Sequence, residues 1–343
     1  MMCTPRPPIR TASNMDKKKW LFLLRLAISL TLIAYFTVSL SRQQGGLGPA
    51  LQRVASAFGS ASPAWLVPAF LLHLVGFTLI SLRWKIMLRV QGIDSPFGRL
   101  FHFYLMAAFF NTFLPSTIGG DTVRAIESRH LTGRTSTSFL VVIVERLTGL
   151  AALVIISTVA LVVLTLTSNQ GTPAMWWIVT PLWIGAAVLI LLAHPGVAPR
   201  LSTALAARLP PRWRQPLIDG QATLARYYHR PALSLAALGI SVVFQLNMVV
   251  YYFLIAGALG RSPDFLDLLL KIPILIFLLM TVPAVNGLGV RTAGFKGLMK
   301  WPAAFALSGE AIDLGMRLVY GLIGGILFLA HRRPVRRGSV NRE

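Results

Sequence analysis

The sequence predicts an all-α polytopic membrane protein with two halves of inverted topology, about six full membrane spans and two broken or re-entrant helical segments. Hydrophobic residues make up 55% of the 343 residues and charged residues only 13%, whereas soluble domains carry roughly 25% charged residues. The apolar residues form eight runs without the period-two alternation of barrel strands, which favours helices. These runs cover residues 20–40, 64–82, 100–114, 136–167, 175–194, 231–258, 268–285 and 304–330.

The first run follows three consecutive lysines, Lys17 to Lys19, and is longer than the apolar core of a signal peptide. We therefore interpret it as a retained anchor that follows a disordered cytoplasmic tail. The expected domain organisation is a tail of residues 1–19, a single transmembrane domain of residues 20–331 with halves 20–167 and 175–331, and a basic cytoplasmic tail of residues 332–343.

Two of the runs are too short or too interrupted to be simple spans. A helix needs about 20 residues to cross the hydrocarbon core, and a break at that depth needs protein or water around its backbone. Run 100–114 is followed by Pro115, Gly119 and Gly120, and run 268–285 leads into Pro283, Gly287 and Gly289. Both runs therefore predict broken or re-entrant helical hairpins.

The distribution of basic residues predicts the topology. With six full spans, one side of the membrane holds 23 of the 33 Lys and Arg residues, in segments 1–19, 83–99, 124–134, 195–230 and 332–343. The positive-inside rule makes that side cytoplasmic, together with both termini. The expected location is a bacterial-type inner membrane. Segment 195–230 is either a set of interfacial helices on the anionic leaflet or a solvated basic loop.

The formal net charge of +22 does not indicate nucleic-acid binding, because the basic residues lie in short stretches between apolar runs. Membrane lipids with anionic head groups are the expected partners, and enzymes of lipid biosynthesis are a second group of candidates. The sequence contains no H-E-x-x-H, G-x-S-x-G or Walker signature. We therefore expect no enzymatic activity, no cofactor and no metal.

A short motif recurs with an offset of 168 residues. Leu114-Pro115-Ser116 aligns with Val282-Pro283-Ala284, and Gly119 and Gly287 each follow their proline by four positions. Inverted halves with broken helices are typical of transporters whose substrate site lies near the bilayer midplane. Chance recurrence among 21 prolines and 28 glycines is the alternative explanation.

Charged residues inside spans cost about 2.5–3.5 kcal/mol each on insertion scales, so each is a functional candidate. Glu145 and Arg146 lie near mid-depth in run 136–167, and adjacent positions on a helix predict different partners for them. Glu310, Asp313 and Arg317 follow an i, i+3, i+7 pattern and share one helix face. Structural ion pairs are the alternative interpretation.

Residues around the two breaks are further candidates. Asp121 is expected to hold a cation, to pair with Arg124 or Arg146, or to cap a helix beginning at Thr122. Arg124 and Arg291 suit a phosphate group, because a guanidinium binds phosphate with two hydrogen bonds. The other candidates for the translocation path are Asn111, Pro115, Gly119, Gly120, Pro283, Asn286, Gly287 and Gly289, whereas His73 is interpreted as structural.

Three motifs carry a family resemblance. They are Asn111-Thr-Phe-Leu-Pro115-Ser-x-x-Gly119-Gly120-Asp121-x-x-Arg124, Glu145-Arg146-x-x-Gly149-Leu150 and Val282-Pro283-x-x-Asn286-Gly287-Leu288-Gly289-Val290-Arg291. Together they resemble the lysylphosphatidylglycerol synthase transmembrane, or flippase-like, family over about residues 18–331. That family usually has Glu after the last arginine, where this chain has Thr292; Glu310 and Asp313 are the candidate replacements.

In two-function synthases of this family, a soluble domain makes the aminoacylated lipid and the membrane domain moves it across the bilayer. The resemblance therefore implies a stand-alone membrane domain without aminoacyl transfer. We expect a lipid translocase for an amphiphile with an anionic or zwitterionic head group. The alternatives are a non-transporting accessory protein of lipid or envelope biosynthesis and, less favoured, an intramembrane transferase with Asp121 or Glu145 as general base.

The inverted topology predicts that cysteines introduced at Ser168 and at Ser202 face opposite sides of the membrane, because the uncharged loop after residue 168 and the basic segment 195–230 are predicted on opposite sides. Labelling of intact cells with a membrane-impermeant thiol reagent checks this expectation. Reaction of both positions from the same side would contradict the inverted halves.

Overall fold

The computed structural model describes residues 47–113, 117–133, 135–168, 210–282 and 287–331, with scattered positions between 31 and 38 and between 176 and 204. The regular secondary structure of these residues is helical, which confirms the predicted all-α class. The helices are α2 (Leu47–Gly59), α3 (Pro63–Val90), α4 (Phe97–Phe113), α5 (Thr117–Thr132), α6 (Thr135–Ser168), α9 (Pro211–Tyr228), α10 (Pro231–Ala258), α11 (Phe265–Thr281), α12 (Val290–Gly297) and α13 (Ala303–His331).

Within the described ranges, four helices are long and apolar enough to cross a membrane, namely α3, α6, α10 and α13. Their apolar stretches of 28–31 residues correspond to about 42–46 Å of helix, which exceeds the hydrocarbon thickness of about 30 Å. They contain four of the predicted spans. The other two predicted spans, residues 20–40 and 175–194, lie outside the described residues except for scattered positions.

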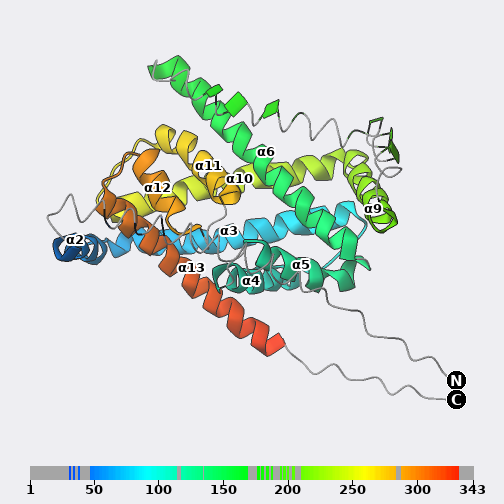
Figure 1. Ribbon diagram of the computed structural model, residues 1–343, viewed down its shortest axis with the longest axis horizontal. Helices are drawn as coiled ribbons and strands as arrows, with labels where there is room; N and C mark the ends of the chain where they lie inside the picture. The colour runs from blue at the N-terminus through cyan, green and yellow to red at the C-terminus, as the bar shows by residue number, and fades with distance from the viewer. Residues whose placement is uncertain are drawn as a thin grey trace.

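Helices α3 and α10 form an antiparallel pair at the centre of the molecule (Figure 1). At one end, the Ser62 amide donates to the Ala258 carbonyl at 3.0 Å. At the other end, Arg230 Nη1 donates to the Arg89 carbonyl at 2.9 Å. Between them, Asn247 Nδ2 donates to the Leu72 carbonyl at 3.2 Å, so the pair is in contact along its whole length.

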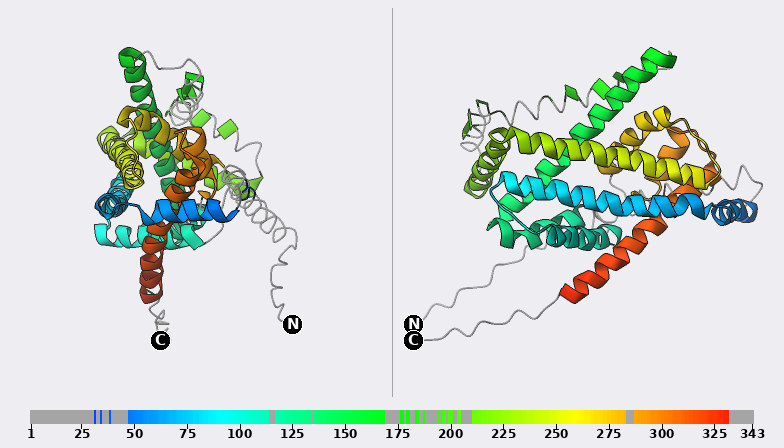
Figure 2. Two further views of the ribbon diagram at one scale, coloured as in Figure 1. Left: turned by 90° about the vertical axis from the view of Figure 1, so that its left-hand side faces the viewer. Right: turned by 180° about the vertical axis from the view of Figure 1, so that it is seen from behind.

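Two pairs of shorter helices approach this centre from opposite ends. Helices α4 and α11 have 17 residues each, which is about 25 Å and less than the hydrocarbon thickness of about 30 Å. Helix α4 begins near the end of α3 and is followed by α5, whereas α11 begins near the end of α10 and is followed by α12 (Figures 1 and 2). Because α3 and α10 are antiparallel, these two starting points lie at opposite ends of the molecule.

The two turns between the short helices differ. The turn before α12 contains Gly287 with φ +70° and Gly289 with φ +77°, a left-handed conformation that glycine adopts without steric cost. Gly119 and Gly120, by contrast, lie inside α5, which begins at Thr117. The helix after the first break thus begins at Thr117 and not at Thr122, so the alternative in which Asp121 caps a helix beginning at Thr122 is wrong.

Each long outer helix packs on the short helix of the other half of the sequence: α13 packs along α4, and α6 packs along α11. The α4–α13 crossing is close because two adjacent glycines face α4. A Cβ atom on Gly324 would overlap the Leu105 carbonyl, and one on Gly325 would lie 2.7 Å from the Phe109 ring. The sequence of α13 thus fixes how near the two backbones come.

Gly324→Ala is expected to destabilise the protein by about 1–3 kcal/mol, the usual cost of overpacking, because the new methyl group would overlap the Leu105 carbonyl. Gly315→Ala is the matched control, since Gly315 lies in the same helix and a Cβ there meets nothing within 4 Å. Thermal unfolding of both purified variants in detergent checks the difference. An equal loss of stability in the two variants would contradict the close α4–α13 contact.

Candidate functional site

The first ion-pair cluster is centred on Glu145 of α6. Its carboxylate accepts hydrogen bonds from Arg83 Nη2 at 2.7 Å and from Arg124 Nη1 at 2.8 Å, and it also accepts one from the Tyr104 hydroxyl. Glu145 is only 2% exposed. A buried carboxylate is costly unless charged partners compensate for its lost hydration, and here two guanidinium groups from α3 and α5 do so.

Asp121 of α5 extends this cluster. Its carboxylate accepts from Arg124 Nη2 at 2.8 Å and from Arg146 Nε at 2.5 Å. Glu145 and Arg146 therefore have different partners, as the sequence predicted. The Arg124 guanidinium also lies over the rings of Tyr104 and Trp84, at 4.2 Å and 5.2 Å from their centroids, a geometry that favours a cation.

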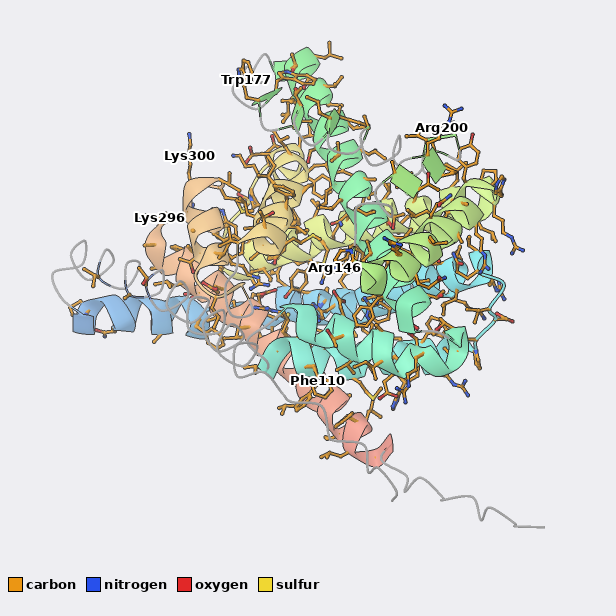
Figure 3. All side chains as sticks on the ribbon, turned by 45° about the vertical axis from the view of Figure 1, so that its right-hand side comes forward. Phe110, Arg146, Trp177, Arg200, Lys296 and Lys300 are labelled. Atoms are coloured by element: carbon orange, nitrogen blue, oxygen red, sulfur yellow. The ribbon has the colours of Figure 1, made fainter. Side chains whose placement is uncertain are left out.

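Arg146 is the most accessible member of the first cluster, with 39% of its side chain exposed. Figure 3 shows Arg146 near the centre of the molecule, whereas the labelled Arg200 and Lys300 lie toward opposite sides of the view. The first cluster thus runs from the fully buried Arg124 to a partly exposed arginine at its edge.

The second ion-pair cluster is centred on Asp313 of α13. Its Oδ2 atom lies 2.9 Å from Arg291 Nε and 2.8 Å from Arg317 Nη2, and its Oδ1 atom accepts a hydrogen bond of 2.9 Å from the Tyr251 hydroxyl. Asp313 is 2% exposed. Each half of the sequence thus contains a buried carboxylate that binds two arginines, one of them from the second short helix of that half.

Glu310 holds the turn before α12. It accepts a hydrogen bond from the Gly289 amide at 2.7 Å and another from the Thr292 hydroxyl. Thr292 occupies the position where the family that the chain resembles usually has Glu. In this chain the carboxylate of Glu310, on α13, contacts that position by accepting a hydrogen bond from the Thr292 hydroxyl. Of the two candidate replacements, Glu310 contacts Thr292 and Asp313 contacts Arg291.

A cavity of about 200 Å³, which we call the central cavity, lies where the two clusters approach each other. Arg124 and Asp121 line it from the first cluster, and Arg317 lines it from the second. Arg317 is the middle residue of α13, and Phe77, another lining residue, is near the middle of α3. The remaining lining residues are His73, Ile80, Tyr104, Ala107, Ala108, Asn111 and Thr112.

The structure places the other predicted site residues as follows. Asn111 lines the central cavity, and its Oδ1 accepts from the Gly120 amide at 2.9 Å. Three predicted residues do not line the cavity but lie next to it. Arg146 contacts the lining residue Asp121, Glu145 contacts the lining residue Arg124, and Arg291 contacts Asp313, the partner of Arg317. Gly119 is helical, and Gly287, Gly289 and Glu310 form or hold the turn before α12. Pro115, Pro283 and Asn286 lie outside the described residues.

Sequence reasoning missed several polar residues of this site. Arg83 was counted among the loop residues after run 64–82, but α3 continues to Val90 and buries its guanidinium. Tyr104 and Tyr251 carry the hydroxyl groups that complete the two carboxylate shells. His73 lines the cavity and stacks on Tyr320 at 5.0 Å between ring centroids. The tyrosines in the apolar runs could have indicated these positions, because a buried tyrosine hydroxyl needs a hydrogen-bond partner.

No group of three or more His, Cys, Asp or Glu side chains could hold a metal ion in the part of the chain that the structure describes. The arrangement instead offers two guanidinium groups, one carboxylate and one amide around a cavity with an apolar wall. Guanidinium groups bind phosphate and carboxylate with paired hydrogen bonds. The site therefore suits an amphiphile with a charged head.

Comparisons with known proteins find similarity to membrane proteins. The family described as the lysylphosphatidylglycerol synthase TM region matches residues 22–324. A UPF0104 membrane protein of Methanocaldococcus jannaschii is 29% identical over 70 residues, which cover 20% of this chain and 21% of that protein. The match thus spans about a fifth of the length of that relative. No solved structure matches the chain.

Glu145→Gln is expected to destabilise the protein by about 3–5 kcal/mol, because it leaves the buried Arg83 without its carboxylate and removes one of two from Arg124. The double variant Arg83→Gln with Glu145→Gln is expected to recover part of that loss, since it removes both charges of one pair. Thermal unfolding in detergent measures both effects.

The control is Asp94→Asn, which breaks the exposed Arg89–Asp94 pair of 3.1 Å at the end of α3. Exposed ion pairs contribute little to stability, so no measurable change is expected there. If Glu145→Gln were as harmless as Asp94→Asn, the buried cluster would not stabilise the fold.

Proposed function

The chain belongs to the lysylphosphatidylglycerol synthase transmembrane family, and from that premise we propose that it is a lipid translocase for an amphiphile with an anionic or zwitterionic head group. One observation carries the proposal: two arginines from different halves of the sequence, the buried Arg124 and Arg317 with 14% of its side chain exposed, line one cavity midway along the spans. Charged groups at that depth are costly, and a charged ligand is a direct reason to retain them.

The central cavity offers polar partners that replace the hydrogen bonds to water that a lipid head group would lose in hydrocarbon. Arg124 and Arg317 supply hydrogen-bond donors for a phosphate, and Asn111 supplies an amide. Phe77, Ile80 and the two alanines at positions 107 and 108 form an apolar wall along which a lipid tail packs while it remains in the bilayer. Asp121 and Asp313 neutralise the same arginines when no head group is bound.

The packing supports two inverted halves. The helix pairs α4–α5 and α11–α12 start from opposite ends of the antiparallel α3–α10 pair, and the contact of α4 with α13 has its counterpart in that of α11 with α6. In transporters of inverted topology, one half rocks against the other around a fixed site. The central cavity, lined by α3, α4 and α5 of one half and by α13 of the other, has the position of such a site.

The rest of the proposal concerns the setting of the protein. We propose an inner-membrane location with both termini and the basic segment 195–230 on the cytoplasmic side, where anionic lipids attract arginine and lysine. The partners are the lipids themselves, and the protein carries out transport without catalysis. A non-transporting accessory role for lipid-biosynthesis enzymes is the competing hypothesis, and it predicts no lipid movement by the purified protein.

Reconstitution into liposomes tests the function. The full chain is expected to move fluorescent phosphatidylglycerol or phosphatidylethanolamine between leaflets, detected by chemical quenching of the outer leaflet. Arg317→Gln is expected to slow this movement at least about tenfold, because one charge-assisted donor pair is worth about 1.5–3 kcal/mol.

Arg89→Gln is the matched control, because Arg89 is an exposed arginine on α3 outside the central cavity. It is expected to retain the wild-type rate. Wild-type protein that moves neither lipid faster than empty liposomes, or Arg317→Gln protein with an undiminished rate, would contradict the proposal.

A further inference from the structure

A second cavity, of about 360 Å³, lies where the end of α3 meets the junction of α9 and α10. We call it the terminal pocket; its lining residues are Val90, Gln91, Gly92, Arg226, His229 and Arg230. Val90 is ten residues beyond Ile80 of the central cavity on the same helix, which corresponds to about 15 Å along α3. The two cavities share no lining residue.

We propose that the terminal pocket is a phosphate-binding site at the membrane interface. The pocket adjoins the end of the spanning helix α3 and the first residue of the spanning helix α10, which is the depth at which lipid phosphates lie. Its ligand chemistry is a phosphate group, supplied either by an anionic lipid head or by a free phosphate in solution.

Two arginines in the terminal pocket are oriented by hydrogen bonds that leave most of their donors unused. Arg226 Nη1 donates to Gln91 Oε1 at 3.1 Å, and Arg230 Nη1 donates to the Arg89 carbonyl at 2.9 Å. Each bond involves one nitrogen of a guanidinium that has five N–H groups. Both side chains belong to exposed residues, so a phosphate can reach them from solvent or from the lipid surface.

Hydrogen bonds hold Gln91, which lines the terminal pocket, in place. Gln91 is 8% exposed, and its Nε2 donates to the Thr223 carbonyl at 3.2 Å, which fixes the oxygen that holds Arg226. The neighbouring Tyr227 hydroxyl donates to the Met87 carbonyl at 3.3 Å, and burial raises the pKa of that phenol still further above neutral pH. Fixed partners reduce the entropy that the arginines lose when a ligand binds.

The charges around the terminal pocket favour an anion. None of the described residues that line it is acidic, and the nearby Asp94 carboxylate accepts a 3.1 Å hydrogen bond from Arg89. Helix α10 begins next to it at Pro231 without a side-chain cap on its first turn, so the positive end of that helix dipole adds to the two guanidinium charges. A phosphate there would contact Arg226 in the last turn of α9 and Arg230 directly before α10.

Thermal unfolding of the purified full chain in a neutral detergent tests this site. Dioctanoyl phosphatidylglycerol is expected to raise the unfolding temperature of the wild type, whereas dioctanoylglycerol, which lacks the phosphate, is expected to leave it unchanged. Arg226→Gln with Arg230→Gln should raise the half-maximal phosphatidylglycerol concentration at least about tenfold. Arg226→Lys with Arg230→Lys, which keeps both charges without the planar donors, should raise it less and guards against misfolding of the first variant.

One further variant and a free-phosphate titration complete the test. Arg99→Gln removes an exposed arginine near the same end of α3 without touching the pocket, and it should retain the response. A response to sodium phosphate, compared with sodium chloride at equal ionic strength, would show that free phosphate suffices, and no such response would assign the site to lipid. Three results would each overturn the proposal, whatever the outcome for lipid movement. They are an equal response to dioctanoylglycerol, no response to any phosphate, and a wild-type response in the Arg226/Arg230 glutamine variant.

Discussion

Two buried carboxylates, Glu145 and Asp313, hold the transmembrane region together, because each binds two arginines that could not otherwise be placed in a membrane. Removing charges from water costs several kcal/mol per ion, and only close, well-directed partners compensate for that cost. The hydroxyl groups of Tyr104 and Tyr251 complete the two carboxylate shells. Helices α3, α5 and α6 are thereby tied together in one half, and α10, α12 and α13 in the other.

The two clusters also determine what the protein can bind. Arg124 and Arg317 are each paired with a buried carboxylate, and both also line the central cavity. A head group that replaces part of this carboxylate coordination finds donors already oriented, so little reorganisation is needed on binding. Close helix contacts at Gly120 and Gly324 keep the walls in place, since any side chain at these positions would collide with α4.

The sequence predicted the fold class and most of the site-bearing helices, because hydropathy and proline and glycine positions report directly on membrane helices. It also placed Asp313 and Arg317 on one helix face, and their side chains are in contact at 2.8 Å. It missed Arg83, because α3 continues beyond the apolar run 64–82 to Val90, and composition alone does not locate a helix end outside such a run. It placed glycines 119 and 120 at the first break, whereas both lie inside α5 and Gly120 packs closely on α4.

The most direct test of a charged head group in the central cavity is a structure of the full chain in nanodiscs that contain phosphatidylglycerol, solved by electron cryomicroscopy. The account predicts phosphate density within hydrogen-bond distance of both Arg124 and Arg317, with acyl-chain density along Phe77 and Ile80. A central cavity without lipid density, and with Arg317 still bound to Asp313 at every lipid concentration, would contradict it.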